Sequence, residues 1–147
     1  MSKHPRPVQG LHLTAELSGC APDHPWMCQA PVLAASCRAW VRHAGLTAVG
    51  ECFHAFGPDD QAQAQDHAPA NGQASGVTGM VLLAESHLAV HTWPERGAVT
   101  LDVFVCNLNH DNSDKAHALM DALVRGFEPA QVHRQVWRRG MPLDANT

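Results

Sequence analysis

Strict alternation of apolar and polar residues in two segments, 10–19 and 98–106, limits this chain to a fold that contains a half-buried sheet. The first segment reads "GLHLTAELSG", and the second, "AVTLDVFVC", repeats its pattern. A period of two is typical of a strand that packs one face on a core. The other face of the sheet is then expected to carry polar side chains, namely His12, Glu16, Asp102 and Cys106.

Two other segments carry apolar residues at helical spacing. Pro31 suits the first turn of a helix, and the apolar residues after it recur every three or four positions until Gly45, which suits a C-terminal cap. Ser113 is a good N-cap for a second helix, whose apolar residues continue at the same spacing to Phe127. Two amphipathic helices are therefore predicted.

Three more strands complete the predicted architecture, at 47–56, 76–84 and 130–139. With the alternating segments they make a sheet of about five strands, largely antiparallel because the strand connections are short. A length of 147 residues suits a single domain with a real core. We predict one α+β domain over residues 1–147, a two-layer α/β sandwich with two helices on one face of the sheet.

The segment 57–75 differs in composition from the rest of the chain. It reads "GPDDQAQAQDHAPANGQAS" and contains no large apolar residue. Such a segment cannot bury enough surface to offset the entropy lost on ordering. We therefore expect a mobile loop here.

Composition excludes several classes of function. The net charge is −4, and Arg134, Arg138 and Arg139 form only a local basic group, so no nucleic-acid partner is expected. No window approaches the roughly 18 to 20 apolar residues of a membrane span, and the first residues lack the apolar core of a signal peptide. We expect a cytoplasmic protein with no membrane partner. Five cysteines, never spaced as C-x-x-C, predict neither a disulfide framework nor a zinc ribbon.

The segment 79–95, "GMVLLAESHLAVHTWPE", places a Glu-Ser pair and two histidines in an otherwise apolar stretch. A structural interpretation treats His87 and His91 as satisfied histidines of the core or of a sheet edge. A metal site would need both histidines on one helix face, with Cys106 or Glu95 as further ligands. Because Leu, Ala and Val between the histidines favour a strand, no metal site is predicted.

A third interpretation makes the Glu85–Ser86 peptide a scissile bond. The serine hydroxyl would attack the preceding carbonyl in an N-to-O acyl shift, the ester would eliminate to dehydroalanine, and hydrolysis would leave a chain that begins with a pyruvoyl group. This chemistry needs a strained peptide, a donor to the oxyanion and a base for the serine α-proton. Thr78 or a neighbouring hydroxyl could be the donor, and His91 could be the base.

The segment 76–106, together with "GLHLTAEL" near the start and "CFHAF" before the loop, resembles the small bacterial and archaeal S-adenosylmethionine decarboxylases. Members of this family are made as proenzymes and cleave themselves to form a pyruvoyl cofactor. The resemblance spans residues 9–140 and includes E-S-H-x-x-x-H-T-W-P-E followed by D-x-F-x-C. It implies a pyruvoyl-dependent decarboxylase that acts on a small molecule and supplies aminopropyl groups for spermidine synthesis.

The resemblance also implies a role for each motif residue. Ser86 would become the pyruvoyl group, which condenses with the substrate amine as a Schiff base and accepts the electrons released with carbon dioxide. Cys106 matches the cysteine that returns a proton to the α-carbon. His91 matches the processing histidine, and Thr78 falls where the family often has a processing serine.

Substrate contacts and assembly follow from the same resemblance. Phe56 falls where an aromatic ring stacks on adenine, and Glu95 matches the acid that holds the ribose hydroxyls. Glu16 matches an acidic residue near the site. The implied working unit is a homodimer of cleaved protomers, with each active site near the interface.

Two departures from the family pattern leave other functions open. The loop at 57–75 is longer than in compact members, and Arg-Gly-Ala at 96–98 replaces a stretch that often contains an aromatic residue. Some proteins that resemble this family decarboxylate ornithine or arginine, for which Glu16, Asp102 and Glu95 could form an acidic pocket.

Arg96 would oppose such a pocket if it pointed inward, so S-adenosylmethionine is the predicted substrate. The non-enzymatic alternative is a homologue that does not cleave and serves as a binding or regulatory partner.

Overall fold

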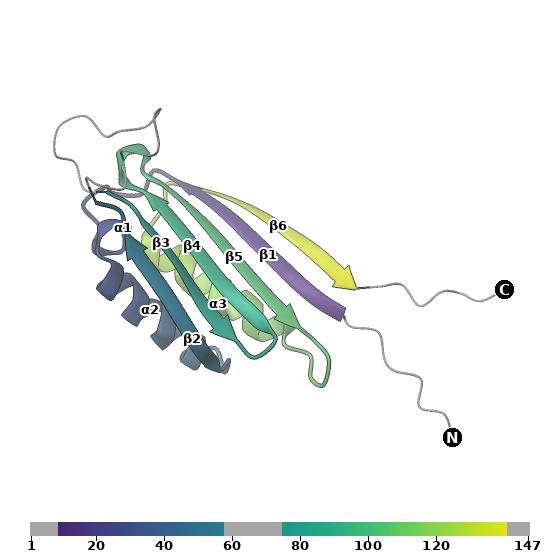
Figure 1. The fold of residues 1–147 in the computed structure, drawn as a ribbon. Coiled ribbons are helices and arrows are strands. Elements are labelled where there is room, and N and C mark those ends of the chain that lie inside the picture. The colour runs from purple at the N-terminus through teal and green to yellow at the C-terminus, as the bar shows by residue number, and fades with distance from the viewer. Residues whose placement is uncertain (1–8, 58–74, 141–147) are drawn as a thin grey trace, which may run out of the picture.

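A six-stranded antiparallel sheet runs through the described part of the chain, residues 9–57 and 75–140 of the computed structural model (Figure 1). The strand order is β2-β3-β4-β5-β1-β6, and each neighbouring pair is antiparallel. The bounds are β1 (Gln9–Ser18), β2 (Ala48–Ala55), β3 (Val77–Leu83), β4 (Ser86–Trp93), β5 (Ala98–Cys106) and β6 (Gln131–Gly140).

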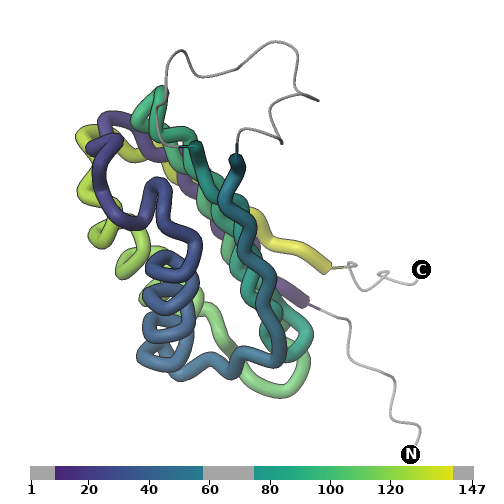
Figure 2. Tube along the Cα trace, turned by 60° about the vertical axis from the view of Figure 1, so that its left-hand side comes forward, coloured from purple at the N-terminus to yellow at the C-terminus, as the bar shows by residue number. Residues whose placement is uncertain are grey.

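Helices cover one face of this sheet. In the described ranges they are α1 (Pro25–Cys28), α2 (Ala30–His43) and α3 (Ser113–Phe127), with a 3-10 turn, η2 (Pro94–Arg96). Figure 2 shows the helices and the sheet as two layers. Helix α2 packs on β2 and β3, whereas α3 packs on β1 and β5. None of these helices is long and apolar enough to cross a membrane.

The predicted two-layer α+β sandwich is confirmed, but the predicted number of strands was one too low. The strand that the sequence analysis did not separate is β4, which begins directly after the two turn residues Ala84 and Glu85. Hairpin turns are usually marked by Gly, Asn or Asp. Because neither turn residue is one of these, the sequence predicted a single strand here, followed by a polar cluster.

The helix ends agree with the predictions in part. Pro31 lies in the first turn of α2, and Gly45 follows its end with φ +81°, the left-handed conformation of a C-terminal cap. Ser113 is the first residue of α3 rather than its N-cap, a position that Asn112 occupies. The backbone N–H of Ser113 donates to Asp111 Oδ1 instead. The predicted mobile loop at 57–75 lies, apart from its two ends, outside the described residues.

The core fills the space between the sheet and the helices. Alternate residues of the central strands enter it, among them Leu13, Val90, Leu101 and Val103, and they meet Leu33, Val41, Leu119, Leu123 and Phe127 of the helices. Thr92 is the buried polar side chain among the described residues. Its hydroxyl donates to the Met27 carbonyl at 2.7 Å and accepts from the Val77 N–H at 2.8 Å. This hydroxyl therefore ties α1 to β3 and β4.

The opposite face, here called the outer face, has no helix over it and carries the other half of each strand. As predicted, His12 and Asp102 are only half-buried on this face, and Glu16 is exposed. Cys106 belongs to the same face by alternation, but its exposed fraction is only 8%. Large apolar side chains are also exposed there: Phe56, Met80, Leu82, Trp93 and Trp137.

We predict that Phe127→Ala strongly destabilises the fold. The Phe127 ring is fully buried and meets the Trp26 ring edge-on, with centroids 5.1 Å apart. Loss of a buried Phe typically costs about 3–5 kcal/mol. Urea denaturation at fixed protein concentration measures the change, and Val136→Ala, at a side chain 57% exposed, is the control. A loss below about 1 kcal/mol for Phe127→Ala would contradict this account of the core.

Candidate functional site

The hairpin between β3 and β4 holds the Glu85–Ser86 peptide in an unusual backbone conformation. Leu83 pairs with Ser86, so that Ala84 and Glu85 form the turn. Glu85 has φ +61°, in the left-handed region. A residue with a Cβ atom pays roughly 1–2 kcal/mol for that conformation. Among the described non-glycine residues only Glu128 shares it, and Glu128 caps a helix, where the conformation is common.

Ser86 lies beside Cys106 although 20 residues separate them along the chain. The backbone N–H of Cys106 donates a hydrogen bond to Ser86 Oγ at 3.1 Å. Ser86 begins β4 and Cys106 ends β5, so the two residues meet at the same end of the sheet. The structure therefore brings together the predicted scissile serine and the predicted proton donor.

The other cysteines lie in different surroundings. Burial is the main cause that raises the pKa of Cys37 to about 12, and the nearby Glu51 adds to the shift. Burial also raises the pKa of Cys20. Both thiols therefore stay neutral near pH 7. Cys52 is exposed on the edge strand β2, which β3 and β4 separate from β5. Cys106 therefore differs from them, because its backbone N–H donates to Ser86 Oγ.

Thr78 and His91 form a second group. They lie directly opposite each other on β3 and β4, and Thr78 Oγ1 is 2.6 Å from His91 Nδ1. The His91 side chain is exposed on the outer face, with its ring 6.1 Å from that of Trp93. A hydroxyl and an imidazole in direct contact can pass a proton between them or to a group above the sheet.

This second group is far from Ser86 within one protomer. His91 lies five residues further along β4, a separation of roughly 17 Å at a rise of about 3.3 Å per residue. Thr78 lies at the same level as His91, because the two residues are paired. The structure therefore does not bring the predicted processing residues to the predicted scissile bond of the same chain.

The predicted substrate-binding residues belong to the end of the sheet that carries His91. Thr100 pairs with His91 on one side and with Glu16 on the other, so these residues form one row across the outer face. Phe56 follows β2 at this end and is 43% exposed, its N–H bonded to the Gly76 carbonyl. Its ring packs edge-on against that of His54, with centroids 5.2 Å apart.

Glu95 lies just beyond the end of β4. It is exposed in the 3-10 turn η2, which Gly97 ends with φ +58°. A Cβ atom on Gly97 would lie 2.8 Å from the Cys20 carbonyl oxygen, so glycine is required there. The Arg-Gly-Ala stretch at 96–98 therefore closes a tight turn directly after Glu95.

The sheet thus carries two partial sites at its opposite ends. The first, which we call the serine end, consists of Glu85, Ser86 and Cys106. The second, which we call the histidine end, consists of Thr78, His91, Glu16, Phe56 and Glu95. Figure 1 shows the length of the strands that separate them.

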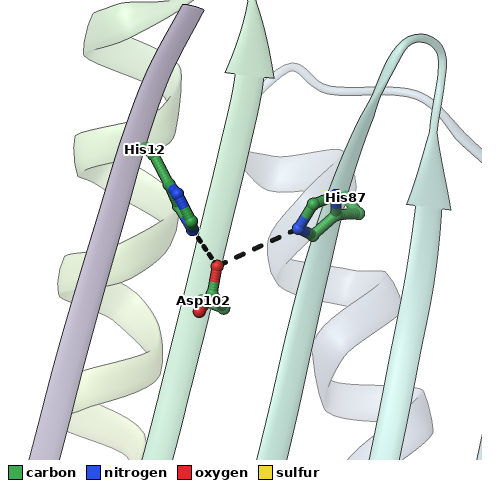
Figure 3. A group of neighbouring side chains, drawn as sticks. All are labelled: His12, His87 and Asp102. Atoms are coloured by element: carbon green, nitrogen blue, oxygen red, sulfur yellow. Dashed lines mark hydrogen bonds and ion pairs between the residues drawn. The ribbon is translucent and has the colours of Figure 1, made fainter. Parts of the chain in front are cut away.

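One cluster on the outer face was not predicted from the sequence. His12 Nε2 is in hydrogen-bond contact with Asp102 Oδ1, and His87 Nε2 lies 3.9 Å from the same oxygen (Figure 3). Strand alternation had placed His12 and Asp102 on one face. Their approach to His87 depends on the pairing of β1, β5 and β4, which no local signal specifies.

Comparison with known proteins gives consistent results. The sequence profile described as S-adenosylmethionine decarboxylase matches residues 11–140. The S-adenosylmethionine decarboxylase proenzyme of Aquifex aeolicus is 32% identical over 132 residues, which cover 90% of this chain and 82% of that protein. The proenzyme of the same name from Archaeoglobus fulgidus is 32% identical over 133 residues, covering 90% and 99%.

A solved structure is similar over nearly the whole chain. The crystal structure of the adenosylmethionine decarboxylase from Aquifex aeolicus superposes with a TM-score of 0.74 at 28% identity. The match covers 97% of this chain and 99% of the other. Sequence and fold therefore point to the same family.

Proposed function

This chain belongs to the S-adenosylmethionine decarboxylase family, and we propose that it cleaves itself between Glu85 and Ser86 to form a pyruvoyl-dependent decarboxylase of S-adenosylmethionine. The product would supply aminopropyl groups for spermidine synthesis. The observation that carries the proposal is the scissile peptide itself, a left-handed Glu85 followed by a serine whose Oγ is held by the Cys106 N–H.

Self-cleavage begins with the Ser86 hydroxyl. Its oxygen bonds to the Glu85 carbonyl carbon while the peptide C–N bond breaks, which leaves an ester and a free Ser86 amine. Removal of the Ser86 α-proton breaks the bond between Ser86 Cβ and the ester oxygen. The main-chain carboxylate of Glu85 leaves, and residue 86 becomes dehydroalanine. Its imine tautomer adds water and releases ammonia, so that the new chain begins with a pyruvoyl group.

Two features of the precursor favour the first step. Relief of the left-handed φ at Glu85 can lower the barrier to breaking the peptide bond, because strain present in the precursor is lost on cleavage. The Cys106 N–H donates to Ser86 Oγ and fixes its position, while the hydroxyl proton stays free to leave. Both features belong to the serine end.

The base and the oxyanion donor must come from another chain if Thr78 and His91 supply them. Within one protomer they are roughly 17 Å from Ser86, too far for proton transfer. A two-fold axis that packs two outer faces against each other can place the histidine end of one protomer over the serine end of its partner. We propose this homodimer as the working unit.

The apolar content of the outer face supports such packing. Five large apolar side chains on it are between 38% and 56% exposed, and they extend from Trp93 at the histidine end to Leu82 and Trp137 nearer the serine end. An exposed apolar set of this extent on a helix-free face marks an interaction surface. Its burial between two protomers would also remove water from both active sites.

Once formed, the pyruvoyl group would supply an electron sink. It would accept the bonding electrons that stay on the substrate when the carboxylate leaves as carbon dioxide. The surroundings fit the group, because the Cys106 N–H points at the position of Ser86 and the Cys106 side chain is nearly buried. Cys106 would then protonate the substrate α-carbon. Phe56 would stack on adenine and Glu95 would accept from the ribose hydroxyls.

A basic amino acid is the second candidate substrate. It would need a carboxylate for its distal cation, and Asp102 is already paired with His12 and close to His87. Glu16 and Glu95 remain at the histidine end, together with Phe56, whose exposed ring has a planar face for adenine. This arrangement favours S-adenosylmethionine.

We expect the purified protein to consist of two fragments, residues 1–85 and 86–147, with a pyruvoyl group at the start of the second. Denaturing mass spectrometry measures this, and Ser86→Ala is expected to remain whole. Glu85→Gly relieves the strain and should slow cleavage by up to about tenfold, whereas Glu85→Ala, which keeps a Cβ atom, should not. Complete cleavage of Ser86→Ala, or an intact active wild type, would refute self-processing.

Mixed dimers test the shared site. Ser86→Ala and His91→Ala chains carrying different tags are each expected to stay uncleaved when expressed alone. When they are co-expressed, the His91→Ala chain retains its serine and receives His91 from its partner. With random pairing, roughly half of the His91→Ala chains lie in mixed dimers and should be cut. Tag-resolved mass spectrometry measures the cut fraction, and no cleavage despite confirmed mixed dimers would exclude sharing.

Carbon dioxide release by the processed enzyme tests the substrate, with S-adenosylmethionine, ornithine, arginine and lysine compared directly. We expect S-adenosylmethionine to be preferred. Phe56→Ala should lower kcat/KM by roughly tenfold through loss of stacking, while Val49→Ala, an exposed apolar control on β2, leaves it unchanged. Glu95→Gln should raise KM. Preference for a basic amino acid with no effect of Phe56→Ala would replace the substrate and keep the cofactor.

A further inference from the structure

Three side chains with metal-binding atoms meet on the outer face and have no part in the proposed reaction. They come from three neighbouring strands, His12 from β1, Asp102 from β5 and His87 from β4 (Figure 3). Their potential ligand atoms, two imidazole nitrogens and one carboxylate oxygen, all lie within 4.8 Å of one another. The three residues are half-buried.

The strand register explains this convergence. Phe104 pairs with His12 on one side and with His87 on the other, so the two histidines flank β5 at one level. Asp102 precedes Phe104 by two residues and therefore shares its face. Its carboxylate lies between the histidines and is close to both, paired with His12 and 3.9 Å from His87 Nε2.

Phe104 also restricts the orientation of both imidazoles. Its ring centroid is 6.0 Å from that of His12 and 5.7 Å from that of His87, and the two imidazole centroids are 6.3 Å apart. Rings packed in this way lose few rotamers when they bind a ligand. Preorganised ligands of this kind reduce the entropy lost on metal binding.

We propose that His12, His87 and Asp102 bind one divalent transition-metal ion, with Zn²⁺, Co²⁺ or Ni²⁺ favoured over Mg²⁺ and Ca²⁺. Imidazole nitrogen suits the first group, whereas Mg²⁺ and Ca²⁺ prefer oxygen ligands throughout. Three protein ligands leave at least one position of a four-coordinate ion for water or another small ligand. No metal site was predicted from the sequence, because only His87 and His91 were considered as a pair of ligands and the residues between them favour a strand.

The distances are compatible with such a centre after a small adjustment. Zn–N bonds of about 2.0–2.1 Å place neighbouring ligand atoms of a tetrahedral site about 3.3 Å apart. His87 Nε2 and Asp102 Oδ1 are 3.9 Å apart, and all the potential ligand atoms lie within 4.8 Å of one another. Rotation of the His87 ring towards the other two ligands would close the remaining gap.

The nearby Arg139 cation is expected to lower the affinity of the site for a metal ion. The guanidinium carbon of Arg139 is 5.0 Å from the centroid of Phe104, the ring that both histidines contact. A metal ion would be repelled by this charge, and the single negative charge of Asp102 offsets it only in part. Removal of the Arg139 charge is therefore expected to strengthen metal binding.

Metal binding is measured without reference to enzyme activity. The full chain, freed of metal with a chelator, is titrated with Zn²⁺ by calorimetry and with Co²⁺ by visible absorption. We expect one ion per chain. His12→Gln, His87→Gln and Asp102→Asn should each weaken binding by more than about tenfold. His117→Gln on α3 and His133→Gln on β6 remove exposed histidines outside the cluster and should leave the affinity unchanged.

Further measurements test the effect of the Arg139 charge, the choice of metal and the independence from self-cleavage. Arg139→Gln should tighten binding, and excess Mg²⁺ should not displace Co²⁺. The same titration on uncleaved Ser86→Ala gives an answer even if the proposed processing is wrong. Circular dichroism confirms the fold of each variant, and if His87→Gln misfolds, His12→Gln and Asp102→Asn decide. Absence of binding, or equal loss in the control variants, would show that the three residues form only a hydrogen-bonded cluster.

Discussion

A sheet with helices on one face only is the constraint on which the rest of the structure depends. Helices α2 and α3 bury the apolar half of each central strand, and the Thr92 hydroxyl ties α1 to the same side. The remaining half of each strand has to face water or another protein. Its polar residues and its exposed apolar residues therefore share one surface, and the residues proposed to act in processing and catalysis lie on that surface or at its ends.

Strand geometry divides this surface. A strand advances about 3.3 Å per residue, so groups at its two ends cannot meet within one flat layer. The serine end holds the strained peptide and Cys106, whereas the histidine end holds Thr78, His91 and the exposed Phe56. The proposed dimer brings the two ends together without any change within a protomer. It also places the apolar residues of the outer face in an interface, where their burial is favourable.

Between the two ends, the register of strand pairing brings together His12, Asp102 and His87. Asp102 lies on β5, between strand β1, which carries one histidine, and strand β4, which carries the other. Phe104 packs against both imidazoles. The proposed metal site requires all three strands, and a shift of one residue in either pairing would turn a histidine to the other face. The same dependence applies to Ser86 and Cys106, which meet because β4 begins where β5 ends.

Local periodicity in the sequence determined the strands at 10–19 and 98–106, the two main helices and the polar character of the outer face, because burial of one face imposes a period on the chain. The motif around Ser86 indicated the chemistry by resemblance. Tertiary structure alone decided the separate strand β4, whose turn carries no glycine, the left-handed φ of Glu85 and the distance between Ser86 and His91. It also decided the meeting of His12, His87 and Asp102. These features depend on which strands pair and in what register, and long-range pairing is set by the packing of the whole domain rather than by any segment of it.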